Sequence, residues 1–186
     1  MTTPTIEFDT PRLSLRAWQD RHRAPFARMN ADPEVRRYFP SILTEEQSNA
    51  SVDFWLQHFS EKGWGNWAVE LRRTREFIGF IGLWVPKQRL PFGDCVEIGW
   101  RLKRDAWGCG YATEGAAECL RVGFNQLELE EIVSFTTVTN LPSVAVMKRI
   151  GMTEHGEPFE HPGVPEGSPL RPHRLFKITR AQWLAR

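Results

Sequence analysis

The chain has 186 residues, and its 24 Lys and Arg nearly balance its 23 Asp and Glu, which leaves a formal net charge of +1. This length suits one domain with one core, and the near-neutral balance argues against nucleic acid or a membrane surface as a partner. No apolar run is long enough to cross a bilayer, and residues 1–10 lack the pattern of a signal peptide. The three cysteines are odd in number and lack metal-ligand spacing, so we expect reduced thiols, no metal site and a cytoplasmic location.

The first third of the chain predicts one strand followed by helices. Leucines alternate with polar residues over residues 10–17, which favours a strand. We expect a short helix over residues 18–30 and a further helical turn opened by Asp32-Pro33. The sequence TEEQ at residues 44–47 is a capping box that begins another helix. Its apolar side chains have helical spacing: Val52, Trp55, Leu56 and Phe59.

The rest of the chain alternates strands and helices. The expected strands cover residues 66–71, 77–85, 96–102, 131–138 and 173–178. Expected helices begin at Thr113 and at Asn140, and Gly151 suits the position just beyond the second helix. Residues 158–172 are rich in Pro and Gly and predict an irregular loop. No linker or repeat divides the chain, so the order predicts one mixed α/β domain over residues 1–186 with a largely antiparallel sheet.

One stretch, Cys95 to Phe124, contains a strand, a glycine loop and a helix in succession. The loop, residues 107–112, includes Gly108 and Gly110, and a helical pattern follows it. A glycine loop that runs into a helix start leaves backbone N–H groups unpaired and pointing outward. Together with the helix dipole, these groups make a site for a phosphate or pyrophosphate.

Several short motifs occur in a fixed order along the chain. They are Thr10-Pro11-Arg12-Leu13, Val96-Glu97-Ile98-Gly99-Trp100 and Trp107-Gly108-Cys109-Gly110-Tyr111-Ala112-Thr113-Glu114, followed by Asn140, Ser143, Lys148 and Gly151-Met152. Together they resemble the GNAT superfamily of acyl-CoA-dependent N-acyltransferases, in the branch of the ribosomal-protein N-terminal acetyltransferases. The resemblance covers nearly the whole chain. One departure is Asp105, which stands where the superfamily loop has Gln or Arg, a side chain that this branch often lacks.

The resemblance implies both a fold and an acyl donor. The implied fold is a mixed, largely antiparallel, six- to seven-stranded sheet with helices on both faces and a splayed pair of parallel strands. That pair would be residues 97–102 and 132–138, with pantetheine between them and the pyrophosphate on the glycine loop. Acetyl-CoA or coenzyme A is the implied co-substrate. The residues expected to contact it are Ile98, Gly99, Trp100, Arg101, Leu102, Trp107, Gly108, Cys109, Gly110, Tyr111, Ala112, Thr113, Asn140, Ser143 and Lys148.

The catalytic candidates are Glu97 and Ser143. Glu97 is the expected general base, because it precedes Gly99, close to the implied position of the acetyl group. The alternative is an ion pair between Glu97 and Arg101, and the sequence leaves both roles open. Ser143 would donate a hydrogen bond to the departing sulfur, or else act with Asn140 as a second cap of the same helix. No Ser-His-Asp or Cys-His set is evident, which favours direct attack by the amine over a covalent acyl-enzyme.

We therefore expect an acetyl-CoA-dependent N-acetyltransferase whose acceptor is a primary amine, either a protein N-terminus or a small molecule. The alternatives are a catalytically silent coenzyme-A-binding regulatory module and an unrelated nucleotide binder, although the loop lacks the Gly-Lys-Ser/Thr ending of a Walker loop. We expect a monomer or homodimer. The resemblance implies an acceptor site formed by the early helices and by the loops at residues 86–94 and 158–172. Its candidate lining residues are Trp18, Tyr38, Phe39, Trp84, His161 and His173.

Overall fold

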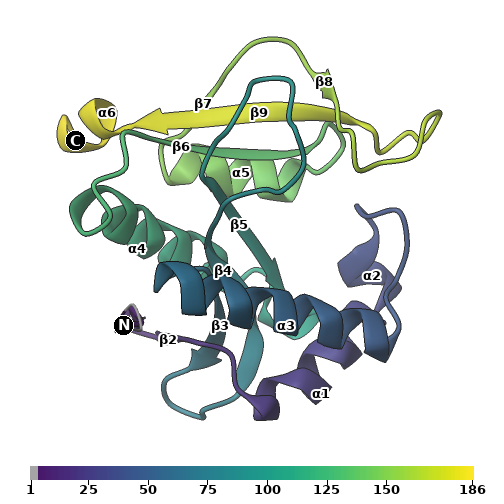
Figure 1. The fold of residues 1–186 in the computed structure, drawn as a ribbon, viewed down its shortest axis with the longest axis vertical. Coiled ribbons are helices and arrows are strands. Elements are labelled where there is room, and N and C mark those ends of the chain that lie inside the picture. Colours follow the sequence, from purple (N-terminus) through teal and green to yellow (C-terminus); the bar gives the residue numbers. More distant parts are fainter. Residues whose placement is uncertain (1–3) are drawn as a thin grey trace.

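A mostly antiparallel sheet of nine strands organises residues 4–186, the part of the chain that this computed structural model describes (Figure 1). The strand order is β1-β2-β3-β4-β5-β6-β9-β7, and β8 pairs with β9. The strands are β1 (Phe8–Asp9), β2 (Leu13–Arg16), β3 (Asn66–Leu71), β4 (Phe77–Trp84), β5 (Glu97–Leu102), β6 (Glu131–Thr137), β7 (Thr153–Glu154), β8 (Phe159–Glu160) and β9 (Pro172–Thr179). The helices are α1 (Asp20–Asn30), α2 (Pro33–Arg36), α3 (Glu45–Lys62), α4 (Tyr111–Asn125), α5 (Leu141–Arg149) and α6 (Arg180–Leu184), with a 3₁₀ turn at Arg104–Ala106.

The sheet has more strands than the six to seven expected. The additional strands are β1, β7 and β8, and each is only 2 residues long. A period-2 pattern cannot be recognised in so short a segment. β8 also lies inside residues 158–172, the stretch expected to be an irregular loop. The single domain expected over residues 1–186 stays a prediction, and residues 1–3 lie outside the described part of the chain.

Local capping signals set the ends of two helices where the sequence predicts them. Thr44 forms the expected capping box at the start of α3. Asn140 caps α5 by accepting a hydrogen bond from the backbone N–H of Ser143. Gly151 follows α5 with a φ of +79°, a left-handed conformation that glycine adopts without a Cβ clash. All these contacts join near neighbours in sequence, so the sequence alone reveals them.

Two helices begin at a residue other than the one expected. α1 begins at Asp20 rather than Trp18, because Gln19 is extended and forms a capping box with His22. α4 begins at Tyr111 rather than Thr113. The earlier start of α4 brings its first N–H groups directly against the glycine loop.

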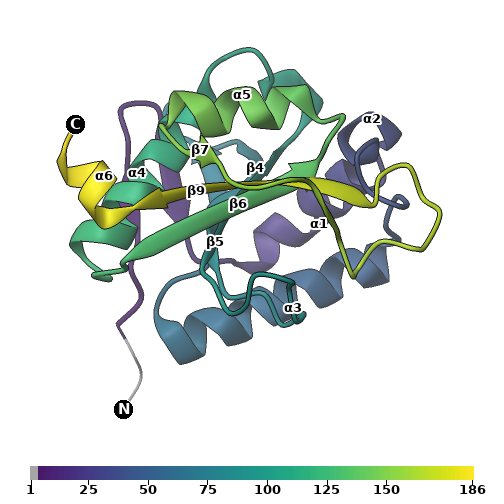
Figure 2. The ribbon, with the colours of Figure 1, turned by 90° about the horizontal axis from the view of Figure 1, so that it is seen from above.

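Helices cover both faces of the sheet, with α1 and α3 on one face and α4 and α5 on the other (Figure 2). Phe80 of β4 packs against Trp55 of α3, with ring centroids 4.7 Å apart. The next residue, Ile81, lies so close to α4 that a Cβ on Gly115 would come within 2.5 Å of it. Because Phe80 pairs with Arg101, the odd-numbered residues of β5 face α1 and α3. None of the described helices is both long and apolar enough to span a bilayer.

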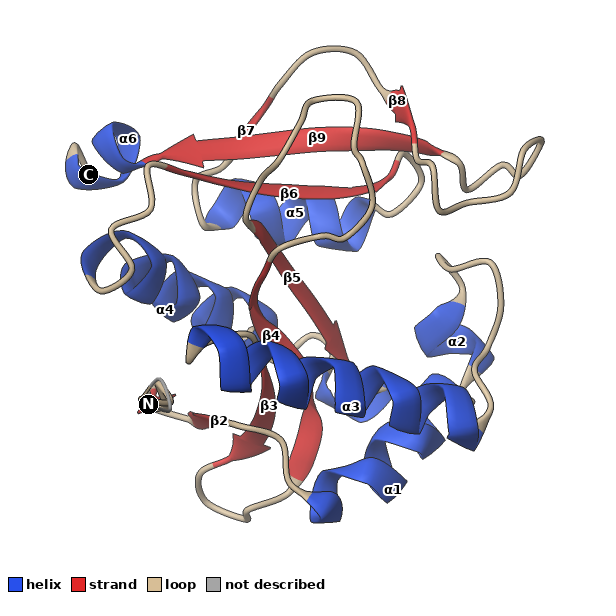
Figure 3. Ribbon diagram, in the orientation of Figure 1, coloured by secondary structure: helices blue, strands red, loops and turns tan. Residues whose placement is uncertain are grey.

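The parallel strands β5 and β6 separate soon after they meet (Figure 3). Their only registered pair is Glu97 with Val133. One step further, the hydroxyl of Ser134 donates to the backbone carbonyl of Ile98 at 2.9 Å, in place of a backbone N–H. This replacement ends the ladder and opens the splayed pair that the family resemblance implies.

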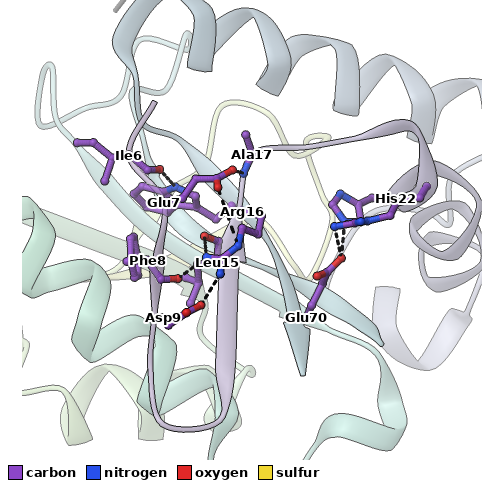
Figure 4. A network of polar contacts seen from close by, with 11 residues as sticks. Ile6, Glu7, Phe8, Asp9, Leu15, Arg16, Ala17, His22 and Glu70 are labelled. Atoms are coloured by element: carbon purple, nitrogen blue, oxygen red, sulfur yellow. Dashed lines mark hydrogen bonds and ion pairs between the residues drawn. The ribbon is translucent and has the colours of Figure 1, made fainter. Parts of the chain in front are cut away.

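A buried polar network fixes the start of α1 against β3 (Figure 4). The backbone N–H of Gln19 donates to Nδ1 of His22 at 3.1 Å, so Nε2 carries the hydrogen and donates to Glu70 at 2.9 Å. Arg21 also pairs with Glu70 at 2.9 Å. Burial lowers the pKa of His22, which favours its neutral form. The network anchors the helical segment that leads to α2 and one wall of the cavity described next.

Candidate active site

A cavity of about 1490 Å³ lies where β5 and β6 separate. Its walls come from β4, β5, β6, the start of α4, α5 and the segment around α2. The predicted site residues that line it are Glu97, Gly99, Trp100, Arg101, Leu102, Trp107, Gly108, Gly110, Tyr111, Ala112, Thr113, Asn140 and Ser143. Three other predicted residues, Ile98, Cys109 and Lys148, are not among its lining. Arg149 lines the cavity beside the exposed Lys148.

The glycine loop presents backbone rather than side chains to the cavity. Gly108 and Gly110 have φ values of +73° and +80°, and Gly110 is the N-cap of α4. The N–H groups of Tyr111, Ala112 and Thr113 belong to the first turn, where no helical carbonyl is available to accept them. These donors and the positive end of the helix dipole meet at one place, which suits an anion.

A clamp from the N-terminal motif holds this loop. The carboxylate of Glu114 accepts hydrogen bonds from the Thr10 hydroxyl and from the Arg12 side chain, both at 2.6 Å. Arg12 also donates to the backbone carbonyl of Cys109 at 2.9 Å and lies over the ring of Tyr111. Thr10 and Arg12 therefore join the start of β2 to the loop and to the start of α4. Glu114, an acidic residue in the first turn of α4, thus serves as the acceptor of this link.

The edge of β5 that faces β6 offers free backbone groups. Ile98, Trp100 and Leu102 turn their N–H and C=O groups toward that edge, because backbone direction alternates along a strand. The indole N–H of Trp107 donates a hydrogen bond to the backbone carbonyl of Leu102 at 2.8 Å, so this carbonyl is already satisfied. Beyond Ile98 no strand pairs with this edge among residues 4–186, so the backbone groups of Trp100 remain open to the cavity.

Glu97 is buried on the α1–α3 side of β5, and only 9% of it is exposed. Its Oε2 has no hydrogen-bond partner within the described residues, and its Oε1 lies 3.9 Å from where a Cβ on Gly99 would be. Burial raises the pKa of Glu97 from 4.5 to about 8. No ion pair joins Glu97 to Arg101 in the described structure, so the alternative role weighed for Glu97 is not observed.

Asn66 supplies a second unpartnered oxygen that the sequence did not suggest. Strand register aligns Asn66 with Gly82 and Gly82 with Gly99. The Gly65–Asn66 backbone approaches Gly82 so closely that a Cβ there would lie 2.3 Å from the carbonyl of Gly65. Asn66 is 4% exposed and lines the cavity, and its Oδ1 has no partner among residues 4–186. Two buried acceptors, on Asn66 and Glu97, thus belong to one face of the sheet, with Glu97 next to the open position at Gly99 and Asn66 in register with it across Gly82.

Ser143 is the third residue of α5 and lines the part of the cavity that this helix forms. Nδ2 of Asn140 donates to the hydroxyl oxygen of Ser143 at 3.1 Å and to the Thr136 hydroxyl at 2.9 Å. The Ser143 oxygen is thus an acceptor from Asn140, which leaves its own O–H free to donate toward the cavity. Asn140 therefore both caps the helix and orients this hydroxyl.

Five of the six acceptor candidates line the cavity: Tyr38, Phe39, Trp84, His161 and His173. The sixth, Trp18, is a core residue that packs on Trp55 and donates its indole N–H to the carbonyl of Asn66. The loops at residues 86–94 and 158–172 meet, since Phe92 packs on Phe159 with centroids 5.2 Å apart. These loops and α2 form walls of the cavity, and the segment at α2 also reaches the glycine loop, since the guanidinium of Arg37 lies 5.6 Å from the centroid of the Trp107 ring.

The rings of His161 and His173 pack in a tilted arrangement, with centroids 4.6 Å apart, against Phe135 of β6. Burial, with a smaller contribution from the neighbouring His173, lowers the pKa of His161 to about 4. Burial also lowers the pKa of His173. Both rings are therefore neutral near pH 7 and contribute aromatic surface rather than charge to this wall.

The geometry coincides with matches to known proteins. Residues 12–153 match the family model described as the acetyltransferase (GNAT) domain. The chain is 34% identical over 198 residues to the FsC-acetyl coenzyme A-N(2)-transacetylase of Aspergillus fumigatus, in an alignment that covers 97% of this chain and 78% of that protein. Both matches extend well beyond the glycine loop.

Solved structures show the same fold. A GNAT-family acetyltransferase from Bacillus anthracis superposes with a TM-score of 0.78 at 24% identity, over 95% of this chain and 99% of that one. The ribosomal-protein acetyltransferase RimL, in complex with coenzyme A, gives a TM-score of 0.74 at 15% identity, over 94% and 98% of the two chains. The family match includes Arg12 and Glu114 of the clamp, the splayed strands and the glycine loop that build this cavity. The chain therefore belongs to the GNAT acetyltransferase family and is an N-acetyltransferase.

Proposed function

We propose that this protein transfers the acetyl group of acetyl-CoA to a primary amine, which attacks the thioester directly. GNAT acetyltransferases in general use acetyl-CoA, and the name of the Aspergillus relative describes transfer to a nitrogen. The observation that carries the proposal is the buried carboxylate of Glu97, unpartnered at Oε2 in the described structure and beside the open position at Gly99. A charged group is costly to bury without a partner, and buried titratable groups of this kind are typical of functional sites.

The backbone of the glycine loop fits the pyrophosphate of coenzyme A. A side chain at Gly108 or Gly110 would strain the left-handed backbone of the loop, and one at Gly110 would also contact the Arg12 guanidinium, so glycine keeps the backbone in the form that can meet a phosphate. We assign the pantetheine arm to the open edge of β5, where the backbone of Trp100 is unpaired. Arg149, which lines the cavity, is better placed than the exposed Lys148 to approach a phosphate.

Glu97 is the proposed general base. An alkylammonium has a pKa near 10, so it must lose a proton before its nitrogen becomes a nucleophile. A carboxylate with a pKa of about 8 accepts such a proton more readily than an ordinary one, directly or through a water. The Oδ1 of Asn66 would accept a second hydrogen from the same nitrogen and so orient its lone pair.

The bond changes then balance without an acyl-enzyme. The amine nitrogen forms a C–N bond with the thioester carbonyl carbon while the C–S bond breaks. Glu97 takes the proton that the ammonium loses before attack, and the sulfur, leaving as a thiolate, takes the second proton that the nitrogen loses as the C–N bond forms. The free O–H of Ser143 donates a hydrogen bond to that sulfur, and the open N–H of Trp100 polarises the carbonyl oxygen.

The experiment is a calorimetric titration with coenzyme A and acetyl-CoA, followed by thiol-release assays over a panel of primary amines and short peptides. We expect both ligands to bind and at least one class of amine to release thiol. Failure of both ligands to bind would refute the proposal. Binding without thiol release across the panel would instead favour the catalytically silent coenzyme-A-binding module.

A further inference from the structure

Arg101 places a positive charge at the end of the cavity that faces α1 and α2. It lies on the same face of β5 as Glu97, because both are odd-numbered residues of that strand. Its Nη1 donates to Oδ1 of Asn30 at 2.9 Å, and its guanidinium lies 4.1 Å from the ring centroid of Phe39. Its Nε is buried without a hydrogen-bond partner among residues 4–186. The side chain is thus held in place by neutral groups only.

A second arginine reinforces this charge. The guanidinium of Arg36 lies 4.3 Å from the centroid of the same Phe39 ring, and its Nε donates to the carbonyl of Ser41 at 2.8 Å. Arg36 is only 8% exposed. Neither arginine has an ion-pair partner in the part of the chain that the structure describes, whereas the neighbouring Arg37 pairs with Glu34. Two nearby cations therefore share one aromatic ring and no carboxylate.

Burying the two guanidinium groups of Arg36 and Arg101 close together, without a carboxylate among the described residues, costs free energy in the isolated protein. Burial lowers the pKa of Arg36 to about 10, and burial together with repulsion from Arg36 lowers the pKa of Arg101 to about 9. Both side chains are still charged near pH 7. An anion in the cavity would offset the lost hydration of these charges, and carboxylates are ordinary partners for a guanidinium.

The phosphates of coenzyme A are poor candidates for this anion. Their proposed site is the glycine loop at the start of α4, and α4 packs on the opposite face of the sheet from α1 and α3. The side chain of Arg101 points instead toward Asn30 of α1 and Phe39. It therefore borders the side of the cavity from which the acceptor would approach.

We propose that the acceptor is a primary amine that also carries a carboxylate, and that Arg101 binds this carboxylate while the nitrogen lies between Glu97 and Asn66. The inference rests on the proposed function and specifies its substrate class. Glu97 and Arg101 are four residues apart on one strand, so their Cα atoms are roughly 13 Å apart. Several bonds must therefore separate the nitrogen from the carboxylate, as in an ω-amino acid or in a peptide with an acidic side chain after its free N-terminus. Polyamines are disfavoured, because their second cation would meet Arg101, the one of the two arginines that lines the cavity.

The test compares acceptors that differ only in charge. The probes are 6-aminohexanoate, its neutral amide and 1,6-diaminohexane, and the readout is kcat/KM from thiol release. We expect the acid to exceed the amide by about tenfold or more, the usual range for a charge-assisted hydrogen bond, and the diamine to be poorest. In Arg101→Met the acid-to-amide ratio should fall to near one. Both rates come from one preparation, so partial unfolding cancels from the ratio.

A matched control is Arg73→Met, an exposed arginine in the turn between β3 and β4 that should keep the wild-type ratio. A short peptide pair that differs by Glu against Gln after the N-terminal residue identifies the source of the carboxylate. A preference seen only with peptides supports the same recognition and assigns it to a protein N-terminus. Equal rates for acid and amide in both series would overturn the inference and leave the proposed function standing.

If no amine is acetylated, a binding experiment still tests recognition of the carboxylate separately from acetyl transfer. Calorimetry with N-acetyl-6-aminohexanoate and its amide measures recognition of the carboxylate without turnover. Tighter binding of the acid by the wild type, lost in Arg101→Met, supports the inference even if the proposed function fails. Equal binding of the two compounds refutes it.

Discussion

Glu97 and Asn66 line one cavity, and neither the Oε2 of Glu97 nor the Oδ1 of Asn66 has a hydrogen-bond partner among residues 4–186. Glu97 lies two residues before Gly99 on β5, and the register of β3, β4 and β5 aligns Asn66 with Gly82 and Gly82 with Gly99. A primary amine that attacks a carbonyl must direct its hydrogens away from the bond being formed. Two acceptors on one face of the sheet near an open position suit that requirement, and they make the role of Glu97 testable in several ways.

Replacing Glu97 with Gln should lower turnover by about 100-fold or more, the usual contribution of a general base. In the wild type, kcat/KM should rise with pH as Glu97 loses its proton near its pKa of about 8. That rise should be absent from Glu97→Gln, while coenzyme A binding stays within a few-fold of wild type. Glu157→Gln, at an exposed position, is the control. An unchanged pH profile in Glu97→Gln would remove Glu97 as the base.

The same substitution should stabilise the fold at alkaline pH. The unfolded chain loses the Glu97 proton near pH 4.5, whereas the folded chain holds it until about pH 8. Between these values the folded state binds the extra proton, so wild-type stability falls as pH rises. The melting temperature of Glu97→Gln relative to wild type should therefore increase from pH 4.5 to pH 9. A difference that does not change with pH would show that the carboxylate is not desolvated in solution.

Gly110→Val should weaken coenzyme A binding by more than its effect on stability explains. Gly110 has a φ of +80°, so any side chain strains the backbone of the loop, and a Cβ there would also lie 3.4 Å from Nη2 of Arg12, the residue that clamps the loop. Gly156→Val is a matched control, because Gly156 has a φ of +70° and a Cβ there would meet nothing within 4 Å. Both variants should lose melting temperature, but only Gly110→Val should lose affinity in calorimetry. Wild-type affinity in Gly110→Val would contradict the loop assignment.

Ser143→Ala distinguishes a catalytic hydroxyl from a capping one. Loss of one hydrogen bond to a developing thiolate should reduce kcat by about tenfold. Asn140 would still cap α5 through the backbone N–H of Ser143, so the melting temperature should change little. Asn140→Ala should instead lower both kcat and stability, the latter by about 1 kcal/mol. If Ser143→Ala lowers the melting temperature and leaves kcat intact, the hydroxyl is only part of the cap.

The sequence predicts those features that depend on neighbours along the chain. Thr44, Asn140 and Gly151 act on backbone groups within one helical turn, so their types and positions suffice. The glycine loop is likewise a continuous segment. By contrast, Asn66 is an ordinary first residue of a strand until register aligns it with Gly82 and Gly99.

The arginine cluster escaped prediction for the same physical reason. Arg36 and Arg101 are far apart in sequence and meet only because the segment after α2 folds Phe39 over β5. A charged residue in a sequence is normally a solvated one, and only the fold reveals that these two lack both water and a carboxylate. Long-range juxtaposition therefore defines the acceptor side, whereas local sequence defines the donor side.

The clamp formed by Arg12 should act on donor binding alone. Arg12 pairs with Glu114 at 2.6 Å and holds the carbonyl of Cys109, so it orders the loop without reaching the reacting atoms. Arg12→Met should raise the KM for acetyl-CoA by about fivefold, equivalent to about 1 kcal/mol, with kcat at saturating donor unchanged. The Arg12 side chain is 48% exposed, so loss of the pair should cost little stability. Arg121→Met removes a comparable pair with Glu118 on the same helix and should leave KM unchanged. A fall in kcat with KM intact would mean that the clamp positions catalytic groups rather than the phosphate loop.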